Sequence, residues 1–304
     1  MNKIASAALM VGCLIVSLTG LAQSEAPPSV RTTEVTPSLF LLQGKGGNVL
    51  ASVGADGILL IDADYAPYAS AYQDALAALV KTGSAPQFVI NTHWHGDHTG
   101  GNAFWGEQGA VIVAHNNVRQ RMSTRQEMKA LGNVVEPSPA VALPVVTYAD
   151  SLALHFNGED IEVQHFARGH TDGDSVVFFS AANVVHLGDH FFKDAFPFVD
   201  IGSGGSVNGY IANIVALLGR VDETTVIIPG HGATQANKAD LQRYHDMLVS
   251  TSAAVVSKLT QGSSIEDIVA QGLGEQWQSW GQGFINEAKW IATIAASEQV
   301  DSAR

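Results

Sequence analysis

The sequence predicts a layered α/β sandwich followed by a helical C-terminal part. Short apolar runs bounded by Gly, Pro or Asn recur along the chain and are typical of strands. Segments with apolar residues at helical spacing lie between them, and both kinds occur in each of two successive halves. With 304 residues, 46% of them hydrophobic, the chain can bury one sizeable core, so we expect a single folded domain.

The first 32 residues differ from the rest. Lys3 precedes an apolar run from Ile4 to Leu21, and Gly20 and Ala22 are small residues at the positions a signal peptidase reads. We expect residues 1–22 to be a cleaved signal peptide, 23–32 a polar leader, and 33–304 the domain, with 236–304 as its helical part. Cleavage would place the protein in the periplasm or outside the cell. An uncleaved membrane anchor and a lipoprotein signal at Cys13 are the alternatives.

In the first half, the expected strands are separated by short turns and two helices. The strands are expected at 39–43, 48–53, 57–62, 88–90 and 111–114. A helix with apolar residues from Tyr68 to Val80 begins after Pro67, and another opens at 100–102. A short basic helix around 119–129 and a Pro-rich loop over 132–144 complete this half.

In the second half, the strands are expected at 161–167, 176–179, 184–187 and 226–228, with a helix at 208–218. From Lys238 onward the chain is expected to be helical. Asn237 is the predicted N-cap, and Asp240 lies in the first turn.

Charge and cysteine content restrict the kinds of partner. Cys13 is the only cysteine and leaves with the signal, so any metal must be bound by His and carboxylate groups. A net charge of −13 repels phosphate backbones, which disfavours a nucleic-acid partner. No apolar run beyond residue 30 is long enough to cross a membrane. We therefore expect a small-molecule substrate and no membrane contact after cleavage, while the oligomeric state stays open.

Four side chains that can bind metal lie within six residues, directly after an apolar run. They are His93, His95, Asp97 and His98. A loop at a strand end can turn such side chains toward one point, whereas a surface turn with histidines is the competing interpretation. Three later residues also follow apolar runs and have Gly neighbours, namely His170, Asp189 and His231. Because Gly permits close backbone approach, we expect all seven to converge on one metal site.

These motifs resemble those of the metallo-β-lactamase superfamily. Residues 91–101, N-T-H-W-H-G-D-H-T-G-G, match its H-x-H-x-D-H signature, and 169–171, 187–189 and 229–232 match the later motifs in order. The resemblance covers about residues 33–235 and implies a four-layered αββα sandwich. It also implies one zinc held by His93, His95 and His170, a second held by Asp97, His98 and His231, and Asp189 as a bridge between them.

The ligand chemistry agrees with that division. Catalytic zinc keeps three protein ligands and an open position, and six terminal ligands divide into three and three. The expected reaction is attack on a carbonyl by a metal-bridging hydroxide, with Asp97 as the catalytic residue that holds the second zinc and orients the hydroxide. Manganese or iron also suits such ligands.

Three substrate classes compete. Export favours a β-lactam or similar cyclic amide, which the sequence places narrowly first. Known metallo-β-lactamases generally carry Cys or Ser at the position of Asp189, however, and the Asp bridge is the usual pattern for esterases and lactonases. Thioester hydrolysis of the glyoxalase II kind is the third class, although few basic residues follow Lys238 to bind glutathione. Lys193 is a candidate anchor for a substrate carboxylate.

Other residues near the motifs are expected to have supporting roles. Trp94 should point into the core, and His186 should pack on its strand. Thr99, Gly100 and Gly101 are candidates for orienting the ligands, as is His190.

Overall fold

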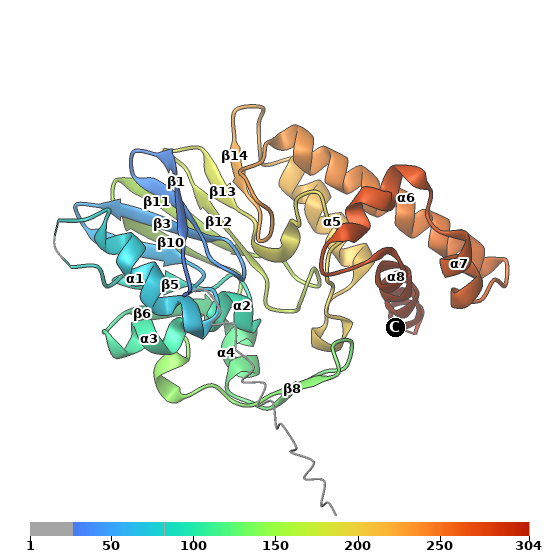
Figure 1. Ribbon diagram of the computed structural model, residues 1–304, viewed down its shortest axis with the longest axis horizontal. Coiled ribbons are helices and arrows are strands. Elements are labelled where there is room, and N and C mark those ends of the chain that lie inside the picture. Colours follow the sequence, from blue (N-terminus) through green and yellow to red (C-terminus); the bar gives the residue numbers. More distant parts are fainter. Residues whose placement is uncertain (1–26, 82, 304) are drawn as a thin grey trace, which may run out of the picture.

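The computed structural model describes residues 27–81 and 83–303 and contains two β-sheets packed face to face, with helices on both outer faces (Figure 1). The arrangement is the four-layered αββα sandwich with C-terminal helices that was expected. The predicted signal peptide, residues 1–22, lies outside the described residues.

The first sheet has the strand order β1-β2-β3-β4-β5-β6-β9. Its strands β4, β5, β6 and β9 run parallel, while β1 to β4 pair antiparallel. The bounds are β1 Arg31–Thr36, β2 Leu39–Gln43, β3 Val49–Gly54, β4 Gly57–Ile61, β5 Phe88–Ile90, β6 Val111–His115 and β9 Val146–Tyr148.

The second sheet has the order β10-β11-β12-β13-β14, and only β13 and β14 are parallel. A small antiparallel pair, β7 with β8, stands apart from both sheets. The bounds are β10 Ser151–Phe156, β11 Glu159–His165, β12 Ser175–Phe179, β13 Val184–His186, β14 Val226–Ile228, β7 Gln126–Met128 and β8 Asn133–Val135.

Helices cover the outer faces and form the C-terminal part. The α-helices are α1 Ala69–Ala77, α2 Gly96–Thr99, α3 Asn102–Glu107, α4 Asn116–Met122, α5 Val207–Leu218, α6 Lys238–Thr260, α7 Ile265–Gln271 and α8 Glu287–Ser302. Short 3₁₀ helices are η1 Ala66–Tyr68, η2 Ala140–Ala142, η3 Gly188–His190, η4 Ile201–Ser203 and η5 Glu275–Gln282. Within the described residues, no helix combines the length and apolar character that a membrane crossing requires.

The alternation of side chains along each strand builds the layers. In β4, Leu59 and Ile61 pack between the sheets, while Leu60 packs with Tyr72 and Trp105 under α1 and α3. The opposite sheet shows the same division. Its outer face joins the largest core cluster, which includes Ile214 of α5, Leu248 of α6 and Ile291 of α8. The helical C-terminal part therefore shares a core with the sandwich.

Several local expectations were wrong. The helix expected around 119–129 ends at Met122, and Gln126–Met128 forms a strand that pairs with β8 inside the expected 132–144 loop. Thr124 bonds back to the carbonyl of Gln120, a side-chain contact that competes with helix continuation. Strand β1 begins at Arg31, inside the expected polar leader. The sequence did not predict this strand, because its side chains are mostly exposed at a sheet edge and show no apolar pattern. Strands β9 and β10 were also missed.

The parallel strands determine where polar loop residues meet. The carboxyl ends of β4 and β5 lie side by side in one sheet, and those of β13 and β14 in the other. The loops that follow these strands lie at one edge of the sandwich. There Asn48 N–H, just before β3, donates to Gly230 O, just after β14, at 2.7 Å.

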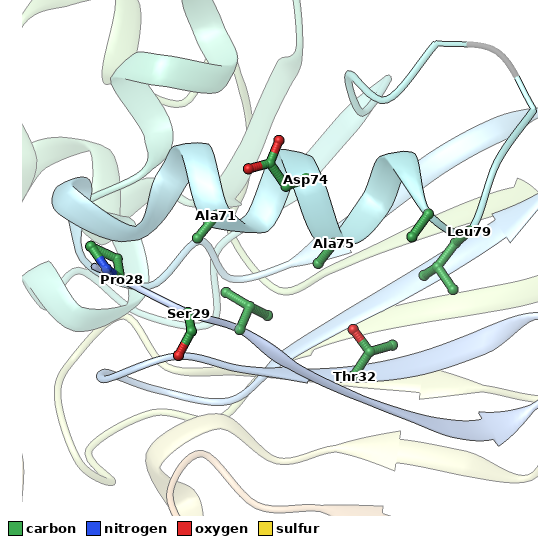
Figure 2. A pocket seen from close by; sticks show the side chains of 9 residues that line it. Pro28, Ser29, Thr32, Ala71, Asp74, Ala75 and Leu79 are labelled. Atoms are coloured by element: carbon green, nitrogen blue, oxygen red, sulfur yellow. The ribbon is translucent and has the colours of Figure 1, made fainter. Parts of the chain in front are cut away.

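A surface hollow of about 310 Å³ lies between β1 and α1 (Figure 2). Its lining is small or apolar apart from Ser29, Thr32 and Asp74. With a single titratable side chain, it offers no cluster for chemistry.

The C-terminal helix α8 is tied to the sandwich by polar contacts as well as by packing. Asp301 accepts from Arg168 at 2.5 Å and from Ser206 Oγ at 2.8 Å, and Ser297 Oγ accepts from Val207 N–H at 2.8 Å. These bonds hold the start of α5 and the segment that leads to His170.

Replacing Asp301 by Ala removes an acceptor shared by Arg168 and Ser206. We expect the free energy of unfolding to fall by about 1–2 kcal/mol, since charge-assisted bonds at a partly buried site are lost. Urea denaturation measures the change. Gln299→Ala, an exposed position on the same helix, is the matched control and should change stability by less than about 0.5 kcal/mol. Equal stability of D301A and the wild type would show that this contact contributes nothing.

Candidate metal centre

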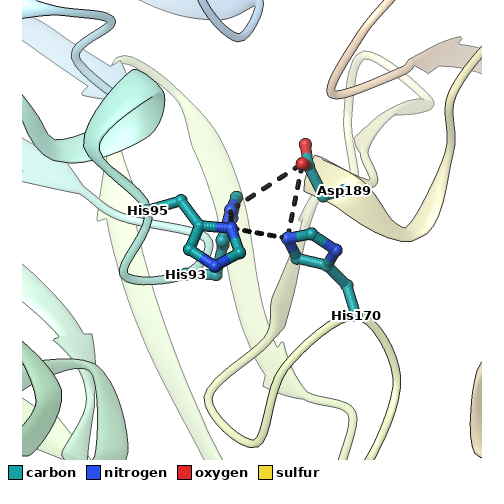
Figure 3. Close-up of side chains that lie close together, drawn as sticks. All are labelled: His93, His95, His170 and Asp189. Carbon is teal, nitrogen blue, oxygen red and sulfur yellow. Dashed lines mark hydrogen bonds and ion pairs between the residues drawn. The ribbon is translucent and has the colours of Figure 1, made fainter. Parts of the chain in front are cut away.

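All seven predicted ligand residues meet at the edge where the strand ends converge. His93, His95, His170 and Asp189 form one group of close ligand atoms (Figure 3), and Asp97, His98 and His231 form a second. Within each group the ligand atoms lie within 4.8 Å of one another. These residues lie in the loops that follow β5, β11, β13 and β14, as expected.

Glycines let the loops approach this closely. A Cβ at Gly230 would lie 2.3 Å from Asp189 Oδ1, so no larger residue fits beside the carboxylate. Gly188 has φ +52°, in the left-handed region that glycine tolerates, and there the chain turns from β13 toward Asp189.

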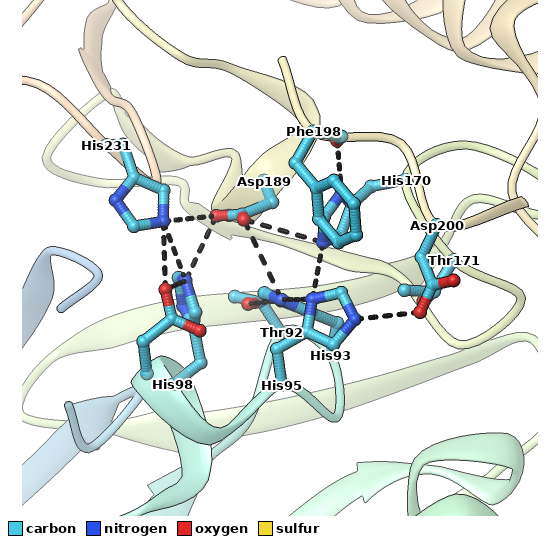
Figure 4. Close-up of polar contacts among 12 residues, drawn as sticks. Thr92, His93, His95, His98, His170, Thr171, Asp189, Phe198, Asp200 and His231 are labelled. Carbon is cyan, nitrogen blue, oxygen red and sulfur yellow. Dashed lines mark hydrogen bonds and ion pairs between the residues drawn. The ribbon is translucent and has the colours of Figure 1, made fainter. Parts of the chain in front are cut away.

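The first group presents three imidazole nitrogens to one point (Figure 4). His95 Nδ1 lies 3.1 Å from His93 Nε2 and 2.8 Å from His170 Nε2. The far nitrogen of His170 lies 2.7 Å from Phe198 O, and that of His95 lies 3.1 Å from Asp200 Oδ2. Because those oxygens only accept, the far nitrogens carry the protons and the near nitrogens carry lone pairs.

The second group is held by carboxylates. His98 Nδ1 lies 2.7 Å from Asp62 Oδ2, which leaves the His98 Nε2 lone pair facing the centre. His231 Nε2 is 3.3 Å from His98 Nε2 and 3.3 Å from Asp97 Oδ2. The side chains of Asp97 and His231 are 21% and 29% exposed, whereas His98 is fully buried, so solvent reaches the centre from the Asp97 side.

Asp189 lies between the two groups. Its Oδ1 is 3.0 Å from His98 Nε2 and 3.4 Å from His231 Nε2, and its Oδ2 is 3.4 Å from His170 Nε2. Among the described residues, Oδ1 is buried and has no hydrogen-bond donor. An ionised carboxylate that is buried in this way requires a positive partner.

The pKa values of the neighbouring groups also indicate that this cluster requires positive charge. Burial raises the pKa of Asp97, but His98 and His231 outweigh it and lower that pKa to about 2. Burial lowers the pKa of His98, but Asp189 and Asp62 outweigh it and raise that pKa well above its usual range. In the first group burial dominates and lowers the pKa of His170 to about 4. The carboxylates are therefore ionised at neutral pH, and protons or metal ions must balance them.

These observations fit a pair of divalent cations. Converging lone pairs 2.8–3.1 Å apart repel one another unless a cation lies among them. Besides Asp189, each group offers three ligands that would hold one cation, and Asp189 lies close enough to contact both. The all-nitrogen and oxygen set suits zinc and also manganese or iron.

Sequence reasoning missed Asp62, which supports both groups. Its Oδ2 accepts from His98 Nδ1 and from Thr92 Oγ1 at 2.8 Å, and Thr92 Oγ1 in turn accepts from His93 Nδ1 at 3.1 Å. Asp62 is fully buried and has φ +66°, which is uncommon for a residue other than Gly. Its signal in the sequence was weak but present, since it ends an apolar strand as Asp189 does. Asp200, on the loop after Phe198, had no such signal.

Lys193, the expected anchor for a substrate carboxylate, has other partners. Its Nζ donates to Thr234 Oγ1 at 2.9 Å and to Gln235 O at 2.7 Å, and Asp240 Oδ2 lies 3.6 Å away. These contacts tie the segment after Asp189 to the start of α6. Substrate anchoring by Lys193 stays a prediction, and the contacts do not favour it.

The residues next to the ligands pack in the core or support the loop backbone. Trp94 is 3% exposed and belongs to the core, as expected, although its indole N–H has no acceptor among the described residues. His186 packs as expected, with Nε2 3.0 Å from Asn48 O. Thr99 Oγ1 donates to the carbonyl of His95, and Gly101 N–H to that of Asp64, so both support the loop backbone. His190 contacts Asn213.

Comparison with known proteins gives a family and several structural neighbours. The family described as the metallo-beta-lactamase superfamily matches residues 37–231. The DIM-1 metallo-β-lactamase is 19% identical, with a TM-score of 0.59 over 73% of this chain and 98% of that chain. The sec-alkylsulfatase Pisa1 from Pseudomonas sp. is 15% identical, with a TM-score of 0.67 over 89% of this chain and 50% of that chain. At these identities the neighbours show a shared fold.

Two curated relatives carry the name hydroxyacylglutathione hydrolase. The protein from Polaromonas sp. is 27% identical over 150 residues, which is 49% of either chain. The protein from Nitrosococcus oceani is 27% identical over 168 residues, covering 55% of this chain and 56% of the relative. The chain thus spans about half the length of the curated relatives it matches.

Loss of one imidazole from the first group should empty it. We expect about two zinc ions per chain in the wild type, and a lower zinc content with no hydrolysis in His93→Ala or His170→Ala. Elemental analysis of the purified protein measures this. His155→Ala removes an exposed histidine that belongs to neither group and is the control. A metal-free enzyme with full hydrolytic activity would contradict the assignment.

Replacing Asp62 by Asn keeps the side chain's shape but removes a carboxylate that fixes two imidazoles. We expect zinc affinity to fall about 10- to 100-fold, because such supporting acceptors fix the tautomer and raise ligand basicity. Competition with a zinc chelator measures the affinity. Asp74→Asn, an exposed position on α1, is the matched control. If D62N bound zinc as tightly as D74N, Asp62 would have no part in metal binding.

Proposed function

Since the chain belongs to the metallo-β-lactamase superfamily, we propose that this metallo-hydrolase holds two zinc ions and cleaves carboxylic acid derivatives, with thioesters and esters ahead of β-lactams. The observation that carries the proposal is the Asp189 carboxylate, which directs one oxygen to each group of three further ligands. Two cations held that way would lower the pKa of a shared water to near neutrality and would polarise a carbonyl oxygen.

The protein's own residues have distinct roles. His93, His95 and His170 would hold one cation, and His98, His231 and Asp97 the other, with Asp189 between them. Asp97 is the acidic ligand on the exposed side, and its pKa of about 2 keeps it ionised. It is therefore placed to orient the attacking water, accept its proton and pass that proton to the leaving group. Asp62, Thr92 and Asp200 keep the imidazoles oriented.

The order of substrate classes follows from leaving-group chemistry and from the relatives. The sequence placed β-lactams narrowly first, because of the expected export. A thiolate leaves as a stable anion, whereas the nitrogen of an amide must be protonated as it leaves. The hydroxyacylglutathione hydrolases, at 27% identity, also support thioesters. β-Lactams stay the second candidate, favoured by the expected signal peptide.

We also propose a location and a type of partner for this enzyme. A cleaved signal over residues 1–22 would deliver it to the periplasm or the medium, and its substrates there would be small acyl compounds. The net charge of −13 supports small molecules over nucleic acid.

A substrate panel tests the proposed reaction. We expect the zinc-loaded protein to hydrolyse a simple acyl thioester and an acyl lactone faster than a penicillin or a carbapenem, as measured by kcat/KM in one buffer. Dependence of each activity on added zinc after chelation provides the control. Penicillin turnover with no thioester or ester turnover would reverse the order of classes, and no turnover of any carbonyl substrate would overturn the proposal.

Asp97→Asn separates catalysis from folding. The amide cannot accept the water's proton, so kcat should fall about 100- to 1000-fold while the melting temperature changes little. Zinc content must be measured on the same sample, because Asp97 is also a ligand. Wild-type kcat at full zinc loading would show that Asp97 has no catalytic part.

A further inference from the structure

The segment 192–198 forms an aromatic wall beside the metal centre. The Phe192 ring stacks on His231, with centroids 4.9 Å apart and planes 13° apart. The Phe198 ring lies 5.7 Å from the His95 ring and 5.8 Å from the His170 ring, and its carbonyl accepts from His170. Phe192 and Phe198 are 8% and 7% exposed. Their rings pack against ligands of both groups and leave little apolar surface for a substrate.

The loop between η5 and α8 adds a further ring to that wall. Phe284 packs edge-on against Phe198, with centroids 6.2 Å apart and planes 83° apart. The loop is fixed, because Phe196 N–H donates to Trp280 O at 2.9 Å, and Trp280 and Ile285 are 6% and 4% exposed. Phe284 itself is 63% exposed. An anchored loop thus presents a bare aromatic ring one ring away from two metal ligands.

A cation accompanies this ring. Lys289, in the first turn of α8, places its Nζ 5.1 Å from the centre of the Phe284 ring and 3.4 Å from the Phe284 carbonyl oxygen. Throughout residues 27–81 and 83–303, no carboxylate lies within ion-pair distance of this ammonium. Lys193, in contrast, is held by Thr234, Gln235 and Asp240. Lys289 is therefore the available positive charge next to Phe284.

We propose that Phe284 and Lys289 determine substrate specificity, and that the enzyme selects acyl compounds with an aromatic or branched apolar group next to a carboxylate. This inference rests on the proposed function and names its substrate class. The apolar group would pack on the exposed Phe284 ring, which gains area burial and aromatic contact. The carboxylate would pair with the Lys289 ammonium. The C-terminal helical part, which carries both residues, would thus give the metal centre its selectivity.

Binding of small thiols tests the proposal without turnover, because thiolates are zinc ligands. The probes are 2-mercapto-3-phenylpropanoate and 2-mercaptopropanoate, which share the thiol and the carboxylate and differ in the phenyl ring. Titration calorimetry on the zinc-loaded full chain measures both. We expect Phe284→Ala to weaken the phenyl probe about three- to tenfold and the other probe less than twofold. Val215→Ala, an exposed apolar position on α5, is the control.

The role of Lys289 is tested with a third probe, 2-phenylethanethiol, which lacks the carboxylate. Lys289→Gln should weaken both carboxylate probes about two- to fivefold and leave 2-phenylethanethiol unchanged. Lys81→Gln, an exposed lysine at the end of the segment after α1, is the matched control. Loss of affinity for all three probes alike, in either variant, would overturn the proposal, because it would indicate damage to the metal centre.

The outcomes for the two proposals are distinguishable. If the thiols show the expected pattern but no carbonyl substrate is hydrolysed, the proposed reaction is wrong and the role of Phe284 and Lys289 in specificity stands. If carbonyl substrates are hydrolysed but F284A and K289Q bind every probe as the wild type does, the role of these two residues is wrong and the proposed reaction stands. A matching loss in kcat/KM for a phenylacetyl thioester, with an acetyl thioester unaffected by F284A, would support both.

Discussion

The Asp62 carboxylate is the buried group through which the two halves of the metal centre are joined. It accepts directly from His98 of one group and, through the Thr92 hydroxyl, from His93 of the other. These bonds fix which nitrogen of each imidazole carries the proton, so the remaining lone pairs all face inward. The fold supplies this arrangement because β4 and β5 are parallel neighbours whose carboxyl ends adjoin. Without a carboxylate at that strand end, His98 Nδ1 and Thr92 Oγ1 would both lose the acceptor they share.

Burying such a cluster of carboxylates and imidazoles is energetically unfavourable, and both cations and the surrounding core must compensate for it. Buried carboxylates and converging lone pairs are unfavourable in a protein interior unless cations compensate them. The orphaned Asp189 oxygen and the raised pKa of His98, which Asp189 and Asp62 raise against the effect of burial, are two signs of that demand. The core clusters on either side give the loops a rigid base, and α8 reaches across to hold the segment that leads to His170. The helical C-terminal part thereby contributes to the geometry of the centre as well as to its rim.

Much of this could be predicted from the sequence, for a physical reason. The seven ligand residues follow apolar strands and have Gly neighbours, and strand ends converge in a sandwich, so the set could be assembled without coordinates. Strands such as β4 and β12 were predicted correctly because they are short, strongly apolar runs. Strand β1 was missed because its side chains are mostly exposed and show no apolar alternation. The β7–β8 pair was missed because basic residues at 119–125 suggested a longer helix. Asp62, Asp200 and Phe284 act through contacts between segments distant in sequence, which a linear pattern does not reveal.

The central claim is that the two groups form one centre for two metal ions, with Asp189 between them. Anomalous diffraction at the zinc edge, from crystals of the zinc-loaded protein, tests this most directly. The account predicts two peaks about 3.5–4 Å apart, one beside His93, His95 and His170 and the other beside Asp97, His98 and His231, with an Asp189 oxygen on each. A single peak, or two peaks that do not share Asp189, would contradict it.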